Sequence, residues 1–187
     1  MTNKFQRVGL VGRSRQEGLQ GVVDELIALL CDRGCTVMLE DRLGAIASRD
    51  CHLLSCDEIG ERADLVIVIG GDGSLLSAAR TLARYNTPVL GINRGRLGFL
   101  TDISPDELAQ QVPSVLNGDF AEEDRFLLDV VVEREGRGIA HADALNDVVV
   151  NSGTSAQMIE FELSIDGEFV YRQRADGLIV STPTGST

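Results

Sequence analysis

Five consecutive apolar residues, Leu65–Ile69, run directly into the segment Gly70-Gly71-Asp72-Gly73-Ser74. An apolar run of this length, without alternating polar residues, is typical of a strand that is buried on both faces of a parallel sheet. Open sheets of this class bind ligands at the carboxyl ends of their strands. The three glycines around Asp72 let a ligand approach the backbone closely. The segment therefore predicts a nucleotide or phosphoryl-transfer site.

The first part of the chain alternates between strand and helix patterns. We expect strands at Arg7–Gly12, Thr36–Glu40, Leu65–Ile69 and Pro88–Ile92. We expect helices at Val22–Leu30, within the mixed segment 41–62, at Leu75–Tyr85 and from Ser104. The last of these starts with a capping serine followed by proline, and Pro113 is expected to keep it short. This alternation predicts a doubly wound parallel sheet.

The pattern changes near residues 118–124, where we place a domain boundary. Further strands are expected at Phe126–Val132, Ala144–Val150, Met158–Ile165, Glu168–Gln173 and Leu178–Ser181, with a turn at Glu135–Gly138 and a hairpin at Asp166-Gly167. The predicted fold class is an α/β doubly wound domain at 1–120, followed at 121–187 by the start of an all-β sandwich domain. Because the small-residue loop Pro183–Thr187 normally leads into further structure, we expect this second domain to be incomplete.

Charge and composition narrow the classes of partner. The net charge of −12 at pH 7, without an evident basic face, argues against nucleic acid as a partner. No apolar run reaches the roughly 18 residues of a membrane span, and no signal-peptide pattern is visible, so we expect a cytoplasmic protein without a membrane partner. The spacing of Cys31, Cys35, Cys51 and Cys56 matches no standard zinc module. Reduced thiols are favoured over a zinc site that includes His52.

Asp72 could act in more than one way. The segment lacks the lysine of a Walker A loop, and Gly9 and Gly12 do not complete a G-x-G-x-x-G sequence, so neither standard nucleotide fingerprint applies. The carboxylate could accept a proton from a substrate hydroxyl, or hold Mg²⁺ against a phosphate. The alternative to a function is an ordinary strand-to-helix turn in which Asp72 or Ser74 caps the helix.

Four further segments place polar or small residues beside predicted strands. In Gly91–Leu100, Phe99 lies either against a flat ring such as adenine or in the core. The pair Asn146-Asp147 lies within an apolar strand, where it either binds ribose hydroxyls or marks a bulge. The segment Arg174–Gly177 either binds a phosphate, carboxylate or amine, or forms a hairpin turn with a surface ion pair. The segment Pro183–Thr187 presents hydroxyls and backbone amides without bulk.

Together and in this order, these motifs resemble those of the NAD kinase family in its bacterial form. The resemblance rests on Gly70–Ser74, Gly91–Leu100, Ala144–Asp147, Met158–Phe161 and Asp176–Thr187, and it covers essentially the whole chain. The Gly-Gly-Asp-Gly sequence alone would also fit diacylglycerol-type lipid kinases and phosphofructokinases. The five motifs in this order are specific to the NAD kinase family.

The resemblance implies transfer of the γ-phosphate of ATP to the adenosine-ribose 2′-hydroxyl of NAD, which gives NADP, with Mg²⁺ or Mn²⁺ as cofactor. It implies that Asp72 is the catalytic proton acceptor. It further implies a homodimer or homotetramer whose dinucleotide site lies partly across a subunit interface, and no residue is assigned as a metal ligand. The binding residues that it implies are Asp72, Gly73, Phe99, Asn146, Asp147, Arg174, Asp176, Thr184 and Thr187.

The chain departs from the family pattern in three places. Asp147 stands where family members more often carry Glu, and Gln157 stands where they often carry a basic residue or His. Family members also continue past Thr187 with most of the second domain, so we expect a C-terminal truncation. The competing functions are a non-catalytic NAD(P)-binding fragment and a lipid or sugar-phosphate kinase with the same glycine-rich segment. The ordered motifs at Asn146, Asp147 and Asp176 argue against the second of these.

Overall fold

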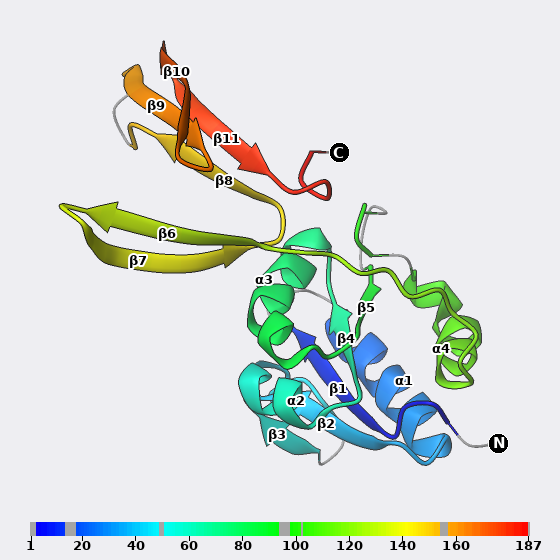
Figure 1. Cartoon of the computed structure of the whole chain (residues 1–187). Coiled ribbons are helices and arrows are strands. Elements are labelled where there is room, and N and C mark those ends of the chain that lie inside the picture. Colours follow the sequence, from blue (N-terminus) through cyan, green and yellow to red (C-terminus); the bar gives the residue numbers. More distant parts are fainter. Residues whose placement is uncertain are drawn as a thin grey trace. The chain divides into compact units, whose positions relative to one another are not determined.

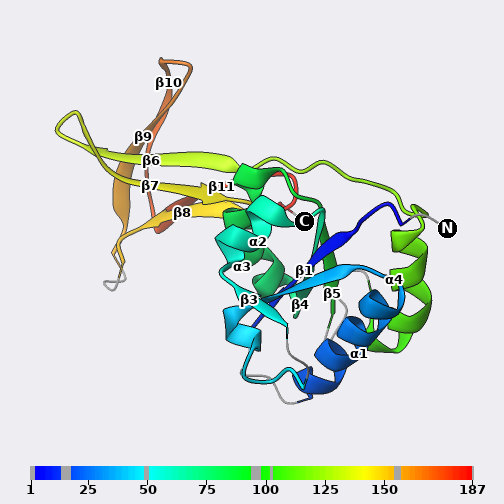
Figure 2. The same ribbon diagram turned by 90° about the horizontal axis from the view of Figure 1, so that it is seen from below.

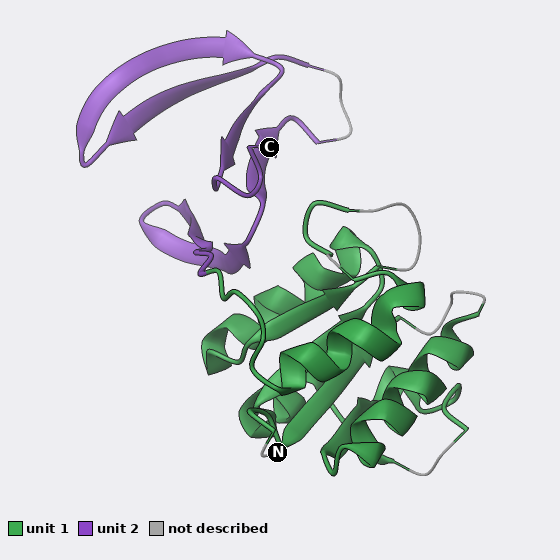
Figure 3. Cartoon of the chain, turned by 90° about the vertical axis from the view of Figure 1, so that its right-hand side faces the viewer, with its two compact units in different colours: residues 1–123 green, residues 124–187 purple. Residues whose placement is uncertain are grey.

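The computed structural model describes residues 3–13, 18–48, 51–93, 98–101, 103–153 and 157–186. The chain divides into two compact units, an N-terminal unit at 1–123 and a C-terminal unit at 124–187 (Figure 3). Within the described ranges, none of the helices combines the length and the hydropathy that a membrane span requires.

A parallel sheet of five strands forms the centre of the N-terminal unit, in the order β3-β2-β1-β4-β5 (Figure 1). Its strands are β1 (Arg7–Gly12), β2 (Thr36–Glu40), β3 (His52–Leu54), β4 (Leu65–Ile69) and β5 (Val89–Ile92). The predicted doubly wound sheet is confirmed. The prediction for 41–62 is incomplete, because β3 forms an edge of the sheet. This strand has only three residues, of which two are exposed, so it carries no apolar pattern.

Helices cover both faces of this sheet. Figures 1 and 2 show α1 and α4 on one face and α2 and α3 on the other. The helices are α1 (Leu19–Asp32), α2 (Cys56–Arg62), α3 (Asp72–Leu82) and α4 (Leu108–Leu116), with 3-10 turns η1 (Asp41–Leu43), η2 (Ala83–Tyr85) and η3 (Pro105–Glu107).

The central strand β4 is buried along its whole length, as its sequence predicts. Leu65, Ile67 and Ile69 belong to the core cluster that also contains the buried faces of α1 and α4. Val66 and Val68 are fully buried but lie outside that cluster, as alternation along a strand requires. Burying one such side chain contributes about 1.5–3 kcal/mol. The packing of β4 therefore fixes the point at which the segment Gly70–Ser74 begins.

Helix α4 differs from its prediction because it does not stop at Pro113. The helix continues through the proline to Leu116. A proline in this position cannot donate a hydrogen bond to the preceding turn. Leu108, Val112 and Leu116 recur at helical spacing and are each at most 1% exposed, so their packing outweighs the missing bond.

The C-terminal unit consists of three antiparallel sheets of two strands each, β6–β7, β8–β11 and β9–β10. Its strands are β6 (Leu128–Arg134), β7 (Arg137–Ala144), β8 (Asp147–Asn151), β9 (Ile159–Ile165), β10 (Glu168–Ala175) and β11 (Gly177–Ser181). The predicted all-β character is confirmed. Among the described residues of this unit, only Leu145 and Thr182 are buried, and many apolar side chains of the strands are exposed.

Two predictions for this unit have different outcomes. The hairpin at Asp166-Gly167 is confirmed, with φ values of 51° and 82° that suit a tight two-residue turn. The single strand expected at Ala144–Val150 is wrong. Ala144 ends β7 and Asp147 begins β8, so the chain changes partner between them. Strand β7 was missed because its eight residues carry few large apolar side chains.

Candidate nucleotide-binding site

The glycine-rich segment follows β4 at the point where the strand order reverses. From β1, the chain builds the sheet outward through β2 and β3, and it then returns to add β4 and β5 on the other side of β1. In open α/β sheets, ligands bind outside the carboxyl ends of the strands at such a switch point. Asp72 comes three residues after the end of β4, and therefore lies at this edge.

Backbone geometry brings Asp72 to the first position of α3. Gly70 has φ of 153°, which residues with side chains rarely adopt, and its N–H donates to the Ile92 carbonyl at 2.9 Å. Gly71 is the N-cap, and among the described residues no side chain caps the helix. The alternative that Asp72 or Ser74 serves as the cap is therefore wrong, as is the expected start at Leu75. The N-terminus of a helix is a favourable position for an anion.

The Asp72 carboxylate instead bonds to the loop that follows β5. The backbone N–H of Phe99 donates to Oδ2 at 3.0 Å, and that of Leu100 donates to Oδ1 at 3.1 Å. We call this pair of hydrogen bonds the Asp72 latch. Gly98 permits the approach, because a Cβ atom there would lie 2.7 Å from Asp72 Cγ and 2.8 Å from Oδ2. The latch joins the glycine-rich segment to Gly91–Leu100, two motifs that the sequence analysis treated separately.

Phe99 is 81% exposed, so the alternative that it belongs to the core is wrong. Its backbone is fixed to Asp72 by the latch, while its side chain is open to a planar ligand. Residues 94–97 of the same motif lie outside the described ranges.

A second group of predicted residues meets in the C-terminal unit. Thr182, which is 1% exposed, donates its hydroxyl to the Leu145 carbonyl at 2.6 Å and its N–H to the Asn146 carbonyl at 2.9 Å. The Asn146 amide donates to Asp147 Oδ2 at 3.1 Å. These contacts hold the loop after β11 beside the loop that precedes β8. Thr182 was not singled out from the sequence, since its role depends on contacts 36 or more residues away.

The same loop carries Thr184. Its hydroxyl accepts a hydrogen bond from Arg125 Nη1 at 2.9 Å, a contact that the sequence analysis missed. Arg125 lies at the other end of the unit's sequence, so no local pattern indicates the pair. Thr187 lies outside the described residues.

Arg174 and Asp176 do not join this group. Asp176 precedes β11, where Gly177 pairs with Asn151, whereas Asp147 pairs with Ser181 at the opposite end of the same two strands. Four residue steps of about 3.4 Å separate the two ends by roughly 14 Å. The expected hairpin turn is also wrong, because β10 pairs with β9 and β11 pairs with β8. Within the described ranges, neither Arg174 nor Asp176 forms an ion pair.

One buried acid near the same edge of the parallel sheet was also missed. Glu40, at the end of β2, is 3% exposed and accepts a hydrogen bond from the Gly12 N–H at 3.0 Å. Burial raises the pKa of its carboxyl above the ordinary value. Burial also raises the pKa of the Cys56 thiol to about 11, and the charge of Glu40 adds to that shift. In the sequence, a Glu at the end of an apolar strand could have indicated this buried acid.

The four cysteines are reduced thiols, as expected. In the part of the chain that the structure describes, their side chains form no converging group of metal ligands with each other or with His52. The less favoured zinc site therefore finds no support there.

Known proteins match the chain along nearly its whole length. Residues 8–120 match the profile of the ATP-NAD kinase N-terminal domain, and residues 145–187 match that of the ATP-NAD kinase C-terminal domain. This chain belongs to the NAD kinase family. Membership of the NAD kinase family confirms the resemblance that the ordered motifs indicated.

Relatives within the NAD kinase family include bacterial proteins and one solved structure. The chain is 54% identical over 185 residues to a NAD kinase of Alcanivorax borkumensis and 52% identical over 189 residues to one of Cellvibrio japonicus. These alignments cover 98% of this chain, but 62% and 63% of those proteins. The crystal structure of yeast NADH kinase complexed with NADH matches with a TM-score of 0.87 at 25% identity, over 99% of this chain and 60% of that one. The chain therefore spans about three fifths of the length of these relatives.

Proposed function

We propose that this chain carries catalytic and dinucleotide-binding residues of an enzyme that phosphorylates the adenosine-ribose 2′-hydroxyl of NAD with ATP, giving NADP. The observation that carries the proposal is a single carboxylate, Asp72, in a glycine-rich segment at the switch point of a doubly wound sheet. Membership of the NAD kinase family supports NAD as the substrate on which this carboxylate acts. In the proposed reaction, Asp72 accepts the proton of the 2′-hydroxyl while that oxygen attacks the γ-phosphorus of ATP.

The Asp72 latch supports a joint role for Asp72 and Phe99. Because both latch bonds come from backbone amides, they keep the Phe99 backbone beside the carboxylate and leave the exposed ring free to meet a ligand. An adenine that lies against Phe99 would then present its own ribose near Asp72. Gly73 adds no side chain at this point, and the uncapped first turn of α3 favours an anionic phosphate.

We assign the remaining contacts to residues of the C-terminal unit. Asn146, Asp147 and Thr184 lie at one end of the β8–β11 pair and would hold ribose hydroxyls and the dinucleotide backbone, together with Thr187. Asp176 immediately precedes β11 at the opposite end of that pair, roughly 14 Å away along the strands, and Arg174 lies two residues earlier, in β10. This separation supports the assignment of Arg174 and Asp176 to the site of a second copy of the chain, as in a homodimer or homotetramer.

The proposed reaction uses Mg²⁺ or Mn²⁺ in the cytoplasm, where ATP and NAD are available. Asp72 is the only carboxylate in Gly70–Ser74, and each of its oxygens already accepts an amide N–H. Mg²⁺ prefers six oxygen ligands and is often held through substrate phosphates. We therefore infer that the cation enters with the phosphates of ATP and that Asp72 acts on the hydroxyl.

A coupled assay tests the proposal. The protein is incubated with NAD, ATP and Mg²⁺, and NADP is read with an NADP-specific dehydrogenase. Asp72→Asn should lower the rate by about 100-fold or more while NAD binding stays within about tenfold. Asp106→Asn is the matched control, because Asp106 is an exposed acid in the first turn of η3. Binding of NAD without turnover would support the non-catalytic alternative, and an unchanged rate in Asp72→Asn would refute the role of general base.

A further inference from the structure

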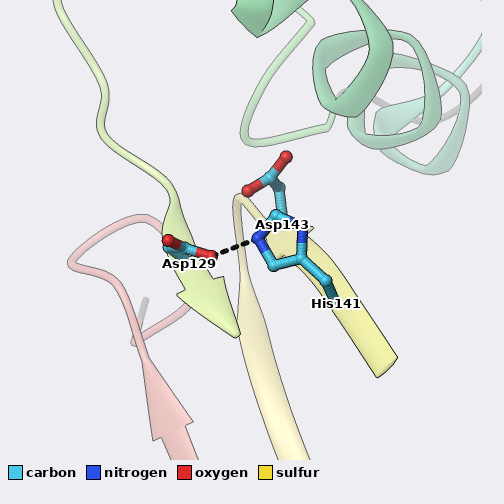
Figure 4. A group of neighbouring side chains, drawn as sticks. All are labelled: Asp129, His141 and Asp143. Atoms are coloured by element: carbon cyan, nitrogen blue, oxygen red, sulfur yellow. Dashed lines mark hydrogen bonds and ion pairs between the residues drawn. The ribbon is translucent and has the colours of Figure 1, made fainter. Parts of the chain in front are cut away.

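Three potential metal ligands converge on one face of the β6–β7 hairpin (Figure 4). Asp129 of β6 lies directly opposite Asp143 of β7, and His141 lies two residues before Asp143 on the same strand. Alternation along a strand places all three side chains on the same face. One ligand atom from each residue lies within 4.8 Å of the other two. We call these residues the hairpin triad.

The charges of the hairpin triad favour the binding of a cation. Two carboxylates directly opposite each other on antiparallel strands repel and destabilise the pair. His141 Nε2 lies 2.5 Å from Asp129 Oδ1, so the imidazole is already turned toward one carboxylate. Asp143 has no hydrogen bond or ion pair within the described ranges.

We propose that the hairpin triad binds a divalent transition-metal ion, with Zn²⁺ as the best match. One imidazole nitrogen and two carboxylate oxygens form a three-ligand set that leaves a position for water. Ligands about 2.1 Å from zinc at tetrahedral angles lie about 3.4 Å apart, so the exposed side chains need only small rotations to reach this geometry. Mg²⁺ is a poor match, because it prefers oxygen ligands alone.

A metal ion at this position would join β6 to β7. An isolated hairpin of two strands is marginally stable in water, and most residues of β6 and β7 are exposed. A shared ion would convert the repulsion between Asp129 and Asp143 into attraction and add a link beyond the backbone hydrogen bonds. This inference concerns the C-terminal unit alone and does not rest on the proposed kinase reaction.

Zinc titration of the 187-residue protein, followed by NMR of the imidazole side chains, tests the proposal. The chain has two histidines, so His52 serves as an internal control. Zn²⁺ should shift the ring signals of His141 in a saturable manner while those of His52 stay in place. This readout separates the hairpin triad from any zinc bound by cysteine thiols.

Two variants complete the test. Asp143→Asn keeps the size of the side chain and removes the repulsion, so it should fold and yet weaken zinc binding at His141 by about tenfold or more. Asp166→Asn, in the turn of the β9–β10 hairpin, should bind as the unaltered protein does. The proposal is overturned if the His141 signals do not respond, if both histidines respond alike, or if Asp143→Asn binds zinc as tightly as the unaltered protein.

Discussion

Replacement of Gly98 by alanine tests the Asp72 latch directly. All three of the nearest atoms to a Cβ at position 98 belong to the Asp72 side chain, and one of them, Oδ1, is closer than any contact a real Cβ makes. The methyl group must therefore push the carboxylate away from the Phe99 and Leu100 amides. Hydrogen bonds to a charged group contribute about 1.5–3 kcal/mol each. Because Asp72 is only half-buried, hydrogen bonds to water replace part of the energy of the two lost bonds. We therefore expect Gly98→Ala to lower the free energy of unfolding by about 2 kcal/mol.

A double-mutant cycle isolates the contact. Urea unfolding is followed by circular dichroism at 222 nm, because the described helices all belong to the N-terminal unit. In an Asp72→Ala background there is no carboxylate to displace, so Gly98→Ala should then cost about 0.5 kcal/mol or less. Gly73→Ala is the matched control, since a Cβ there meets nothing within 4 Å and alanine favours a helix over glycine by up to about 1 kcal/mol.

Additivity would refute this reasoning. If Gly98→Ala costs the same free energy with and without the Asp72 carboxylate, the two residues are not coupled. Equal effects of Gly98→Ala and Gly73→Ala on stability would likewise show that the close approach at Gly98 has no energetic consequence.

Two further predictions concern the stability of the N-terminal unit. Burial raises the pKa of the Glu40 carboxyl above its value in the unfolded chain. The stability that this shift contributes is therefore fully present below the unfolded pKa and is lost as pH rises through the folded pKa. In urea unfolding from pH 4 to 8, the free energy of unfolding of Glu40→Gln should therefore rise relative to that of the unaltered protein as pH rises. A constant difference across this range would contradict the prediction. Pro113→Ala should raise the free energy of unfolding by about 1–3 kcal/mol, because it restores the donor to the Ala109 carbonyl inside α4, and a loss of stability would show that the proline is accommodated without cost.

The parts of the fold that follow from local sequence were predicted well. Strand β4 has apolar residues on both faces, which only a covered parallel sheet accommodates. The turn at Asp166-Gly167 needs two positive φ values, which this dipeptide tolerates. In both cases the information lies in a few adjacent residues.

The features that were missed depend on distant parts of the chain. The Asp72 latch joins side-chain oxygens to backbone amides 27 and 28 residues away. Because nearly every residue has a backbone N–H, the residue types do not indicate which of them donates. The break between β7 and β8 at Asn146 depends on Thr182, 36 residues later. The position of Asp72 in α3 was misjudged because Gly71, without any side chain, serves as the cap.

The central claim concerns one hydroxyl and one carboxylate, and ³¹P NMR of the reaction mixture tests both. With NAD, ATP and Mg²⁺, the protein and its Asp106→Asn variant should produce a 2′-phosphomonoester resonance of NADP. Asp72→Asn should form this product at a rate lower by about 100-fold or more. Phosphate found on another acceptor, or a 2′-phosphate signal that grows equally fast in Asp72→Asn, would contradict the account.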